Sequence, residues 1–500
     1  MGGAAADGAG PGGAAPGGMG GVGVSGGSGG LPGASAGGAG SGDNYATGVT
    51  ITVHPSVRTI LNVAWNQTTA AENVFLEFTF ETGNVMTSRP KPGTVGMHTD
   101  VVLGAPGSTP VTVRVVSRQG GVDYKTRDYM GTTGAIPTGM PVPQVSMYNA
   151  TLASPDRWMF GAVEDSAGGC NSSRCFYNAT FWLYIMDRKG RIVWYYSDAA
   201  SNATSSFQRI ARDGGYIWIE KRPFSSTGTR TVLKRTLDGT YSQSVSVPDL
   251  SDCIDVTTDG SLLYDTRQAA SELRELTRAG TTRVIWRCRD TFASGSCYSN
   301  TVNWNEAGNT VVLSFPERRT VLEINRTNGM VVGQYGADSG SYTFAATPAP
   351  PAPIRAPATG WEFGFQHFAN ITKDGTLMLS THMPGYRETD MPVAGQHAFE
   401  EYTIDRTNRR LTMRWFFQST GEEWAMYKGM AVKLPNNNVL ANFGTGGIIR
   451  EITQDKQTVF MVKFDAPPGT QQNNDFFNKM VGNNVLIDDL YALNTGGPPP

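Results

Sequence analysis

Short hairpins that recur along the chain constrain its fold more than any other feature of the sequence. A turn built on Gly or Asn and followed by an apolar strand occurs five times, with separations of 46, 48, 67 and 62 residues. The turn residues are Gly214, Gly260, Gly308, Gly375 and Asn437. A second hairpin, with an Asp/Arg/Gly turn, is interleaved with the first, and its six copies begin at Leu183, Leu233, Leu273, Leu322, Tyr402 and Ile449.

These repeats predict an all-β chain whose larger part, residues 148–492, is a six-bladed β-propeller. Six copies of the second hairpin, five of them preceded by a copy of the first, indicate six four-stranded units of about 40–50 residues each, and blades of that size bury their faces only against neighbouring blades. We expect the ring to close where the strand 484–487, or the segment around Phe476 and Phe477, completes the blade that begins near 158–160.

The N-terminal part of the chain does not follow this repeat. Residues 44–135 contain short strands separated by turn residues, which suits a small β-sandwich of the fibronectin or immunoglobulin kind with Trp65 in its core. We interpret it as a packing or spacer domain, joined to the propeller by the Pro-rich linker 136–147. Residues 1–43 are almost entirely Gly, Ala, Ser and Pro, which predicts a flexible tether, and 493–500 are expected to form a flexible tail.

The composition bounds the class of protein. With 500 residues, of which 39% are hydrophobic, the chain can bury a large core. Its 41 basic and 43 acidic residues give a net charge of −2, which argues against nucleic acid as a partner. No apolar run approaches the roughly 18–20 residues that a membrane-spanning helix needs. We therefore expect a protein that does not span a membrane, although the tether suggests attachment to a cell surface.

Five cysteines indicate an oxidising compartment. Cys170 with Cys175, and Cys288 with Cys297, stand at loop-closing separations and are predicted to form disulfides, which leaves Cys253 over. The alternative is a cytosolic protein with buried thiols. We expect a secreted, periplasmic or surface-tethered protein.

The order of elements resembles the bacterial arylsulfate sulfotransferase family over roughly residues 47–490. The resemblance is carried by Gln366-His367 at the start of a hairpin that turns at Asp374-Gly375, and by the segment 434–440 followed by 450–453. It implies transfer of a sulfuryl group from an aryl sulfate to a phenol through a sulfated histidine, without a cofactor. By position, His367 matches the nucleophilic histidine of the family.

The chain departs from the family pattern at three places. Asp252-Cys253 stands where the family has His-Asp. Tyr298-Ser299-Asn300 stands where the family has His-x-Asn, so only Asn300 is retained. Arg318 lies two residues beyond the position of a family arginine.

The register of the hairpins predicts which side chains meet. If Asp374-Gly375 forms a two-residue type I′ turn, the numbers of cross-strand partners sum to 749, and His367 faces His382. The same count in other hairpins places Ser206 opposite Lys221, Asp252 opposite Arg267, and Tyr298 opposite Glu317. Because these turns lie on one face of a propeller, the open ends gather on the other face around His367.

Sulfuryl transfer needs a neutral imidazole, cations for the developing oxygen charge, and a donor near the leaving phenolate. The expected catalytic residues are His367, Asn300, Tyr298 and Arg318. The expected substrate-binding residues are His382, Arg267, Lys221 and Arg222. Although His397 adds a third histidine, no carboxylate pattern supports a metal, and none is predicted.

An alternative reading gives the chain no catalytic role. In that case a decayed sulfotransferase scaffold serves as a propeller that binds a ligand or a surface partner, and His367 is a structural residue at a strand end. The presence of cations within reach of His367 distinguishes the two hypotheses. The donor, the acceptor and the oligomeric state are not specified by the sequence.

Overall fold

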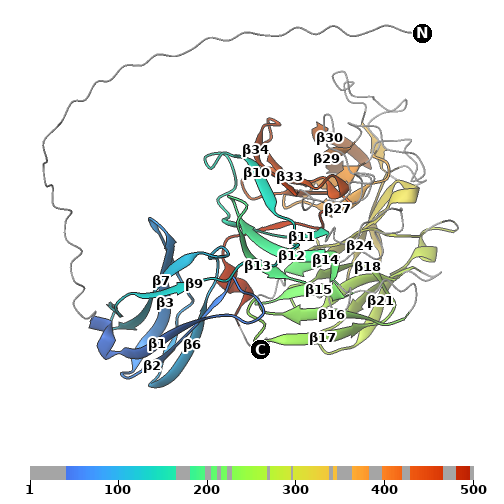
Figure 1. Ribbon diagram of the computed structural model, residues 1–500. Coiled ribbons are helices and arrows are strands. Elements are labelled where there is room, and N and C mark those ends of the chain that lie inside the picture. The colour runs from blue at the N-terminus through green and yellow to red at the C-terminus, as the bar shows by residue number, and fades with distance from the viewer. Residues whose placement is uncertain are drawn as a thin grey trace, which may run out of the picture.

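The protein is an all-β chain, as predicted (Figure 1). The computed structural model describes residues 41–164, 181–197, 204–210, 215–221, 228–266, 271–293, 295, 297–336, 342–345, 363–381, 397–418, 428–464 and 480–495. The helical segments within these ranges are short 3-10 turns, and none has the length and apolar character needed to cross a membrane. They are η1 (Ser41–Asn44), η5 (Cys288–Asp290), η6 (Pro316–Arg318), η7 (Gly444–Gly446) and η8 (Leu490–Leu493).

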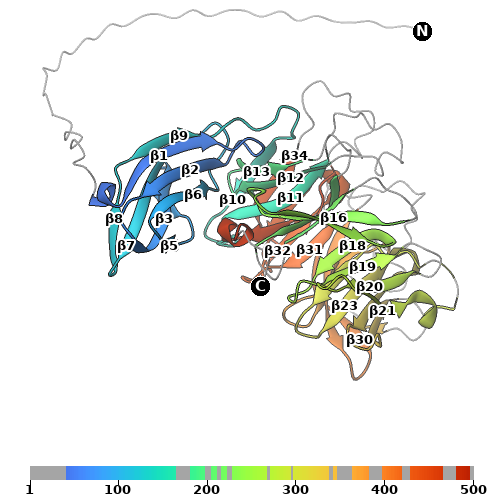
Figure 2. The ribbon, with the colours of Figure 1, turned by 90° about the horizontal axis from the view of Figure 1, so that it is seen from below.

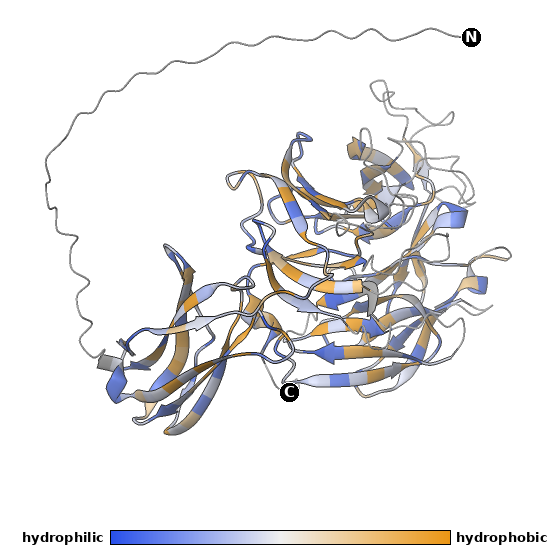
Figure 3. Ribbon diagram, viewed as in Figure 1, coloured by the Kyte–Doolittle hydropathy of each residue, from blue (hydrophilic) through white to orange (hydrophobic). Residues whose placement is uncertain are grey.

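Two antiparallel sheets form the N-terminal part. One contains β1 (Ala46–Val53), β2 (Leu61–Gln67) and β6 (Gly96–Val102). The other contains β3 (Ala71–Glu81), β4 (Asn84–Thr87), β5 (Lys91–Gly93), β7 (Pro110–Gln119), β8 (Val122–Lys125) and β9 (Tyr129–Thr132). Apolar and polar residues alternate along several of these strands (Figure 3). Trp65 is buried as predicted and shares one core with Leu76 and Val113 of the opposite sheet, so the two sheets pack face to face.

The ends of this part differ from the expected boundaries. The described residues begin with η1 at Ser41, where the Asp43 carboxylate accepts a hydrogen bond from the Arg127 amide. The expected linker 136–147 contains the start of β10 (Pro143–Tyr148), which pairs with a strand near the end of the chain. Asn494, in the expected tail, binds Asp238.

Six further sheets follow in chain order in the described residues, each with four antiparallel strands. Sheet 1 is β35 (Val485–Ile487), β11 (Trp158–Glu164), β12 (Phe181–Asp187) and β13 (Ile192–Tyr196). Sheet 2 is β14 (Thr204–Ile210), β15 (Ile217–Lys221), β16 (Arg230–Arg235) and β17 (Ser242–Val247). Sheet 3 is β18 (Leu250–Val256), β19 (Leu262–Thr266), β20 (Glu272–Leu276) and β21 (Thr282–Arg287). Sheet 4 is β22 (Val302–Asn305), β23 (Thr310–Phe315), β24 (Thr320–Asn325) and β25 (Val331–Gly336).

The last two sheets each gain a fifth strand at the outer edge. Sheet 5 is β27 (His367–Ile371), β28 (Leu377–Thr381), β29 (Ala398–Asp405) and β30 (Arg410–Gln418), with β26 (Thr343–Phe344) added parallel to β30. Sheet 6 is β31 (Met430–Lys433), β32 (Val439–Asn442), β33 (Ile448–Ile452) and β34 (Thr458–Phe464), with β10 added to β34. In Figures 1 and 2 these sheets gather to one side of the N-terminal sheets.

The C-terminal strand closes this series, as predicted. β35 pairs antiparallel with β11, so that Phe160 lies opposite Val485 and Trp158 lies opposite Ile487. The innermost strand of sheet 1 is thus supplied by the far end of the chain, which gives a β-propeller-like arrangement. The alternative closing segment around Phe476 lies outside the described residues.

The register expected for the β27–β28 hairpin is wrong. The Thr372 amide donates to the Thr376 carbonyl at 2.8 Å, so the loop has three residues rather than two. Only Gly375 in this loop has a positive φ, whereas a type I′ turn needs two such residues. A further irregularity between 367 and 370 shifts the strand, and His367 lies opposite Ser380 instead of His382.

Counting residues from the turn predicts the cross-strand partners correctly in some of the other hairpins and not in others. Around the turn at Gly308 the register is as predicted, with Val302 opposite Leu313. In sheet 2 an irregularity after position 204 places Lys221 opposite Thr204, so the predicted partner Ser206 is wrong. Irregularities in the strands therefore decide which residues pair at the open ends of the hairpins. Counting from the turn does not detect these irregularities.

One predicted disulfide is confirmed. Cys288 is bonded to Cys297 and closes a loop of sheet 3, while Cys253 is buried and takes no part in this bond. Cys170 and Cys175 lie in a range that the structure does not describe.

Buried glutamates of four sheets bind cations of the next sheet around the ring. Each glutamate lies on the third strand of its sheet, counted from the inside. The pairs are Glu275 with Arg326 at 2.6 Å, Glu323 with Arg406 at 2.8 Å, Glu401 with Lys433 at 2.8 Å, and Glu451 with Arg188 at 2.9 Å. Because the last pair joins sheet 6 to sheet 1, side-chain contacts support the same closure as β35.

Candidate functional site

Gln366 anchors the start of β27 on sheet 4. Its fully buried amide nitrogen donates to the carbonyls of Phe315 and Thr320, each at 3.1 Å. The backbone carbonyl of Gln366 accepts hydrogen bonds from Asn300 Nδ2 at 2.9 Å and from Ser314 Oγ at 3.2 Å. Asn300 thus positions the residue that precedes His367.

The backbone on both sides of His367 is strained. Phe365 has a φ of 52° and Phe368 a φ of 49°, a left-handed conformation that is costly for a residue with a side chain. The hydrogen bonds of Gln366 lie between these two residues and stabilise the conformation. Such strain is frequent at functional sites, where the fold holds a side chain in one place.

The environment of His367 keeps its imidazole neutral. The side chain is half-buried, and its ring centroid lies 5.9 Å from that of Phe365. The pKa of His367 is lowered to about 4, chiefly by burial; a hydrogen bond with the Phe365 backbone opposes this shift, and the charge of Lys428 adds to it. At pH 7 the ring is therefore uncharged and retains a nitrogen lone pair.

A hydroxyl and a second imidazole lie on the same face of sheet 5 as His367. Ser380 is the cross-strand neighbour of His367, so the two side chains leave the sheet on the same side. Ser380 Oγ is 2.9 Å from His397 Nε2, and both residues are buried. We call His367, Ser380, His397 and Lys428 the rim cluster.

Sheet 6 supplies the cation of this cluster. Lys428 precedes Gly429 and β31, and its Nζ lies 5.3 Å from the ring centroid of Phe181. Gly429 packs against the Ser380–His397 pair so closely that a Cβ there would lie 2.3 Å from Ser380 Oγ. Sequence reasoning did not select Lys428. The signal was present, because counting eight residues back from the turn at Asn437, as from Gly375 to His367, gives Gly429.

Arg209 fills the inner space next to this site. It projects from β14 and reaches Asp255 of β18 at 3.4 Å and Asn303 of β22 at 3.2 Å. Its guanidinium carbon also lies 5.4 Å from the ring centroid of Phe368 on β27. The inner strands β14, β18, β22 and β27 therefore meet at the Arg209 side chain. This side chain packs against the strained residue Phe368. No pattern in the sequence singled out Arg209.

One predicted residue, Arg318, is placed away from the expected arrangement, and Lys221 and Tyr298 are only partly placed. Lys221 is half-buried at the end of β15. Arg318 stacks its guanidinium on Phe292, 4.1 Å from the ring centroid, and so lies against the disulfide-closed loop. Glu317 belongs to the turn η6, so the predicted strand pairing of Tyr298 with Glu317 is wrong. Tyr298 is half-buried just after Cys297.

The remaining predicted residues, Arg222, Arg267 and His382, fall outside the described ranges. Among the residues that the structure does describe, no group of three His, Cys, Asp or Glu side chains is placed to hold a metal ion.

Comparisons with known proteins assign no family to the chain. No family model and no curated protein matches it. Among solved structures, virginiamycin B lyase from Staphylococcus aureus is 12% identical, with 54% of this chain and 71% of that chain covered and a TM-score of 0.33. A protein of unknown function from Bacteroides thetaiotaomicron is 11% identical, with 84% and 98% covered and a TM-score of 0.35. Hsv2 from Kluyveromyces lactis is 8% identical, with 79% and 98% covered and a TM-score of 0.33.

Proposed function

We propose that the protein is an arylsulfate sulfotransferase-like enzyme that moves a sulfuryl group from an aryl sulfate to a phenol through His367. The observation that carries the proposal is the neutral imidazole of His367, whose pKa is lowered to about 4 by burial and by the charge of Lys428. A lone pair is what the nucleophile needs, and a fixed positive charge is what the sulfuryl oxygens need.

Two steps account for the transfer. In the first, a ring nitrogen of His367 attacks sulfur, the N–S bond forms, and the bond from sulfur to the aryl oxygen breaks, so the aryloxide leaves and takes a proton from solvent or a nearby donor. In the second, the oxygen of the acceptor phenol attacks sulfur, loses its proton, and breaks the N–S bond. Lys428 stabilises the oxygen charge in both steps, and Gln366 and Asn300 hold β27 in place.

The other assigned residues belong to the same proposal. Tyr298 donates to the leaving oxygen, and Arg318 stabilises charge if it leaves Phe292 when substrate binds. His382, Arg267, Lys221 and Arg222 bind the sulfate and the aryl ring. No cofactor takes part.

The proposed function also concerns the architecture of the protein and its cellular compartment. We assign the six four-stranded sheets as the blades of a six-bladed propeller and the N-terminal sheets as a fibronectin- or immunoglobulin-like sandwich. The disulfide between Cys288 and Cys297 supports an oxidising compartment, hence a secreted, periplasmic or surface-tethered protein.

The test is to trap the intermediate. The protein is mixed with 4-nitrophenyl sulfate without an acceptor, quenched in alkali, digested and mapped by mass spectrometry. We expect one sulfuryl group on the peptide that contains His367, and its loss after a phenol is added. Sulfation of another residue, or none in a folded protein, would contradict the proposal.

The pH dependence provides a separate prediction. Because burial lowers the pKa of His367 to about 4, the reactive neutral form persists as pH falls, and the rate should be limited by His367 protonation only near pH 4. An exposed histidine would lose half of its neutral form near pH 6.5. The measurement is the initial rate of 4-nitrophenolate release between pH 4 and 8, followed at a pH-independent wavelength. A midpoint near 6.5 would show that the imidazole is solvated.

A second function, that of a non-catalytic binding propeller on a decayed sulfotransferase scaffold, is favoured by Arg209. This cation is ion-paired with Asp255 and bonded to Asn303, so it stabilises the inner strands rather than a substrate. Failure of the trapping experiment in a folded protein would favour this second function.

A further inference from the structure

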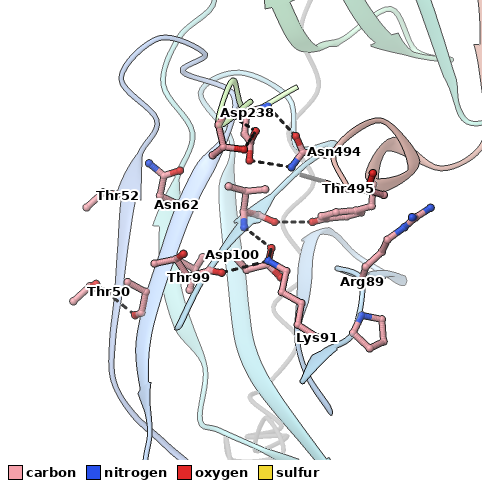
Figure 4. Close-up of a pocket in the computed structure, with 16 residues that line it drawn as sticks. Thr50, Thr52, Asn62, Arg89, Lys91, Thr99, Asp100, Asp238, Asn494 and Thr495 are labelled. Carbon is pink, nitrogen blue, oxygen red and sulfur yellow. Dashed lines mark hydrogen bonds and ion pairs between the residues drawn. The ribbon is translucent and has the colours of Figure 1, made fainter. Parts of the chain in front are cut away.

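A cavity of about 640 Å³ lies between the N-terminal sheets and the rest of the protein (Figure 4). Residues of β1, β2 and β6 line one side. The loop after β16, and η8 with the segment that follows it, line the other. The volume is within the roughly 300–1,000 Å³ of small-molecule sites, which occur preferentially at interfaces between domains.

The floor of the cavity is a polar sheet face. Cross-strand register places Thr52, Asn62 and Val101 in one row across β1, β2 and β6. The neighbouring row is Thr50, Ala64 and Thr99. The alternate residues of β2 face the buried core, so the polar ones face the cavity.

The opposite wall is held rigidly by hydrogen bonds. The Asp238 carboxylate accepts from Thr236 Oγ1 at 2.7 Å, from Thr240 Oγ1 at 2.8 Å and from Asn494 Nδ2 at 3.0 Å. Tyr491 donates its hydroxyl to the Val101 carbonyl at 2.8 Å, which fixes this wall to the floor. The cavity is therefore formed before any ligand binds.

The charges that line the cavity are balanced. Lys91 is paired with Asp100 at 2.8 Å, and Arg89 is paired with Asp489 at 2.9 Å. Asp238 is compensated by its donors. A strongly anionic or cationic ligand would have to displace one of these partners, so the lining favours a ligand without net charge.

The lining offers hydrogen-bonding groups of both kinds. Hydroxyls and carboxamides donate and accept, which matches the hydroxyl groups of sugars. Within the described part of the chain, the side chains of Thr52 and Asn62 make no hydrogen bond to protein, and both are on the floor. We infer that this cavity is a binding site for a neutral carbohydrate of a few sugar units.

The experiment uses the full chain and a panel of neutral trisaccharides, namely maltotriose, cellotriose, xylotriose and chitotriose, with trigalacturonate as the acidic comparison. Binding is measured by calorimetry. Hydrogen exchange detects where it occurs. We expect at least one neutral trisaccharide to bind and to protect the amides of 50–64, 238–240 and 491–495.

The test compares two double variants, each of which changes one cross-strand Thr–Asn pair of β1 and β2. Thr52→Val with Asn62→Ala removes the groups on the cavity floor and should weaken binding about tenfold or more, because two hydrogen bonds are lost. Thr47→Val with Asn66→Ala makes the same chemical change in a cross-strand pair outside the cavity, and binding should stay within about twofold. Absence of binding by every neutral trisaccharide, binding of trigalacturonate alone, protection elsewhere, or equal effects of the two double variants would overturn the inference.

Discussion

The variant His367→Ala is expected to release 4-nitrophenolate from 4-nitrophenyl sulfate no faster than buffer does. Removing the attacking nitrogen removes the covalent step itself, and the loss of a nucleophile in other enzymes costs on the order of 10³–10⁶ in rate. The measurement is the initial rate with a phenol acceptor present, compared with that of the parent protein. The sulfated peptide should disappear in the same variant.

A matched histidine provides the control for this experiment. His98 lies on β6 of the N-terminal sheets, where its ring stacks on Trp65, and His98→Ala should keep the parental rate. Circular dichroism of both variants shows whether they fold. If His367→Ala retains the parental rate in a folded protein, His367 is a structural residue. Added imidazole that restores part of the rate would strengthen the nucleophile assignment.

The variant Glu451→Ala should be the most destabilising of the single substitutions considered. Glu451 is fully buried and binds Arg188 at 2.9 Å and Asn438 at 2.7 Å. Without its carboxylate, the guanidinium of Arg188 stays buried with its charge uncompensated. Removing one partner of a buried ion pair costs about 3–5 kcal/mol. The measurement is the free energy of unfolding from urea titrations followed by tryptophan fluorescence.

An exposed glutamate provides the comparison. Glu306 accepts a hydrogen bond from Thr258 at the surface, so Glu306→Ala should change the free energy of unfolding by at most about 0.5 kcal/mol. The double variant Arg188→Met with Glu451→Gln should be less destabilised than the sum of its single variants, since neither charge is left alone. Equal effects of Glu451→Ala and Glu306→Ala would show that the closing pair contributes nothing.

Much of the fold could be predicted from the sequence because hairpins are local. Turn residues and apolar strands predict the six four-stranded units, and β35 confirms the expectation that the strand 484–487 completes the sheet that begins near 158–160. The pairing of Cys288 with Cys297 followed from their spacing. The register at the rim did not follow, because a three-residue loop and a strand irregularity each move the partner of His367 by one position.

Only part of the candidate site could be predicted from the sequence. His367 was found from its position eight residues before the turn glycine Gly375. The same count from the turn at Asn437 gives Gly429, which is the neighbour of Lys428. Ser380 replaced His382 as the cross-strand partner. Arg318 lies on Phe292, because a turn in the chain at η6 directs it there.

The sequence by itself determined which segments become strands, how they follow one another, and which end closes the series, since each of these depends on neighbours along the chain. Tertiary structure decided which side chains meet. His397 reaches Ser380 from the residue before β29, Arg209 joins four inner strands, and the cavity over Asn62 exists only because two parts of the chain are packed together. These contacts depend on inter-sheet packing and on strand irregularities of one residue, and neither leaves a periodic signal in the sequence.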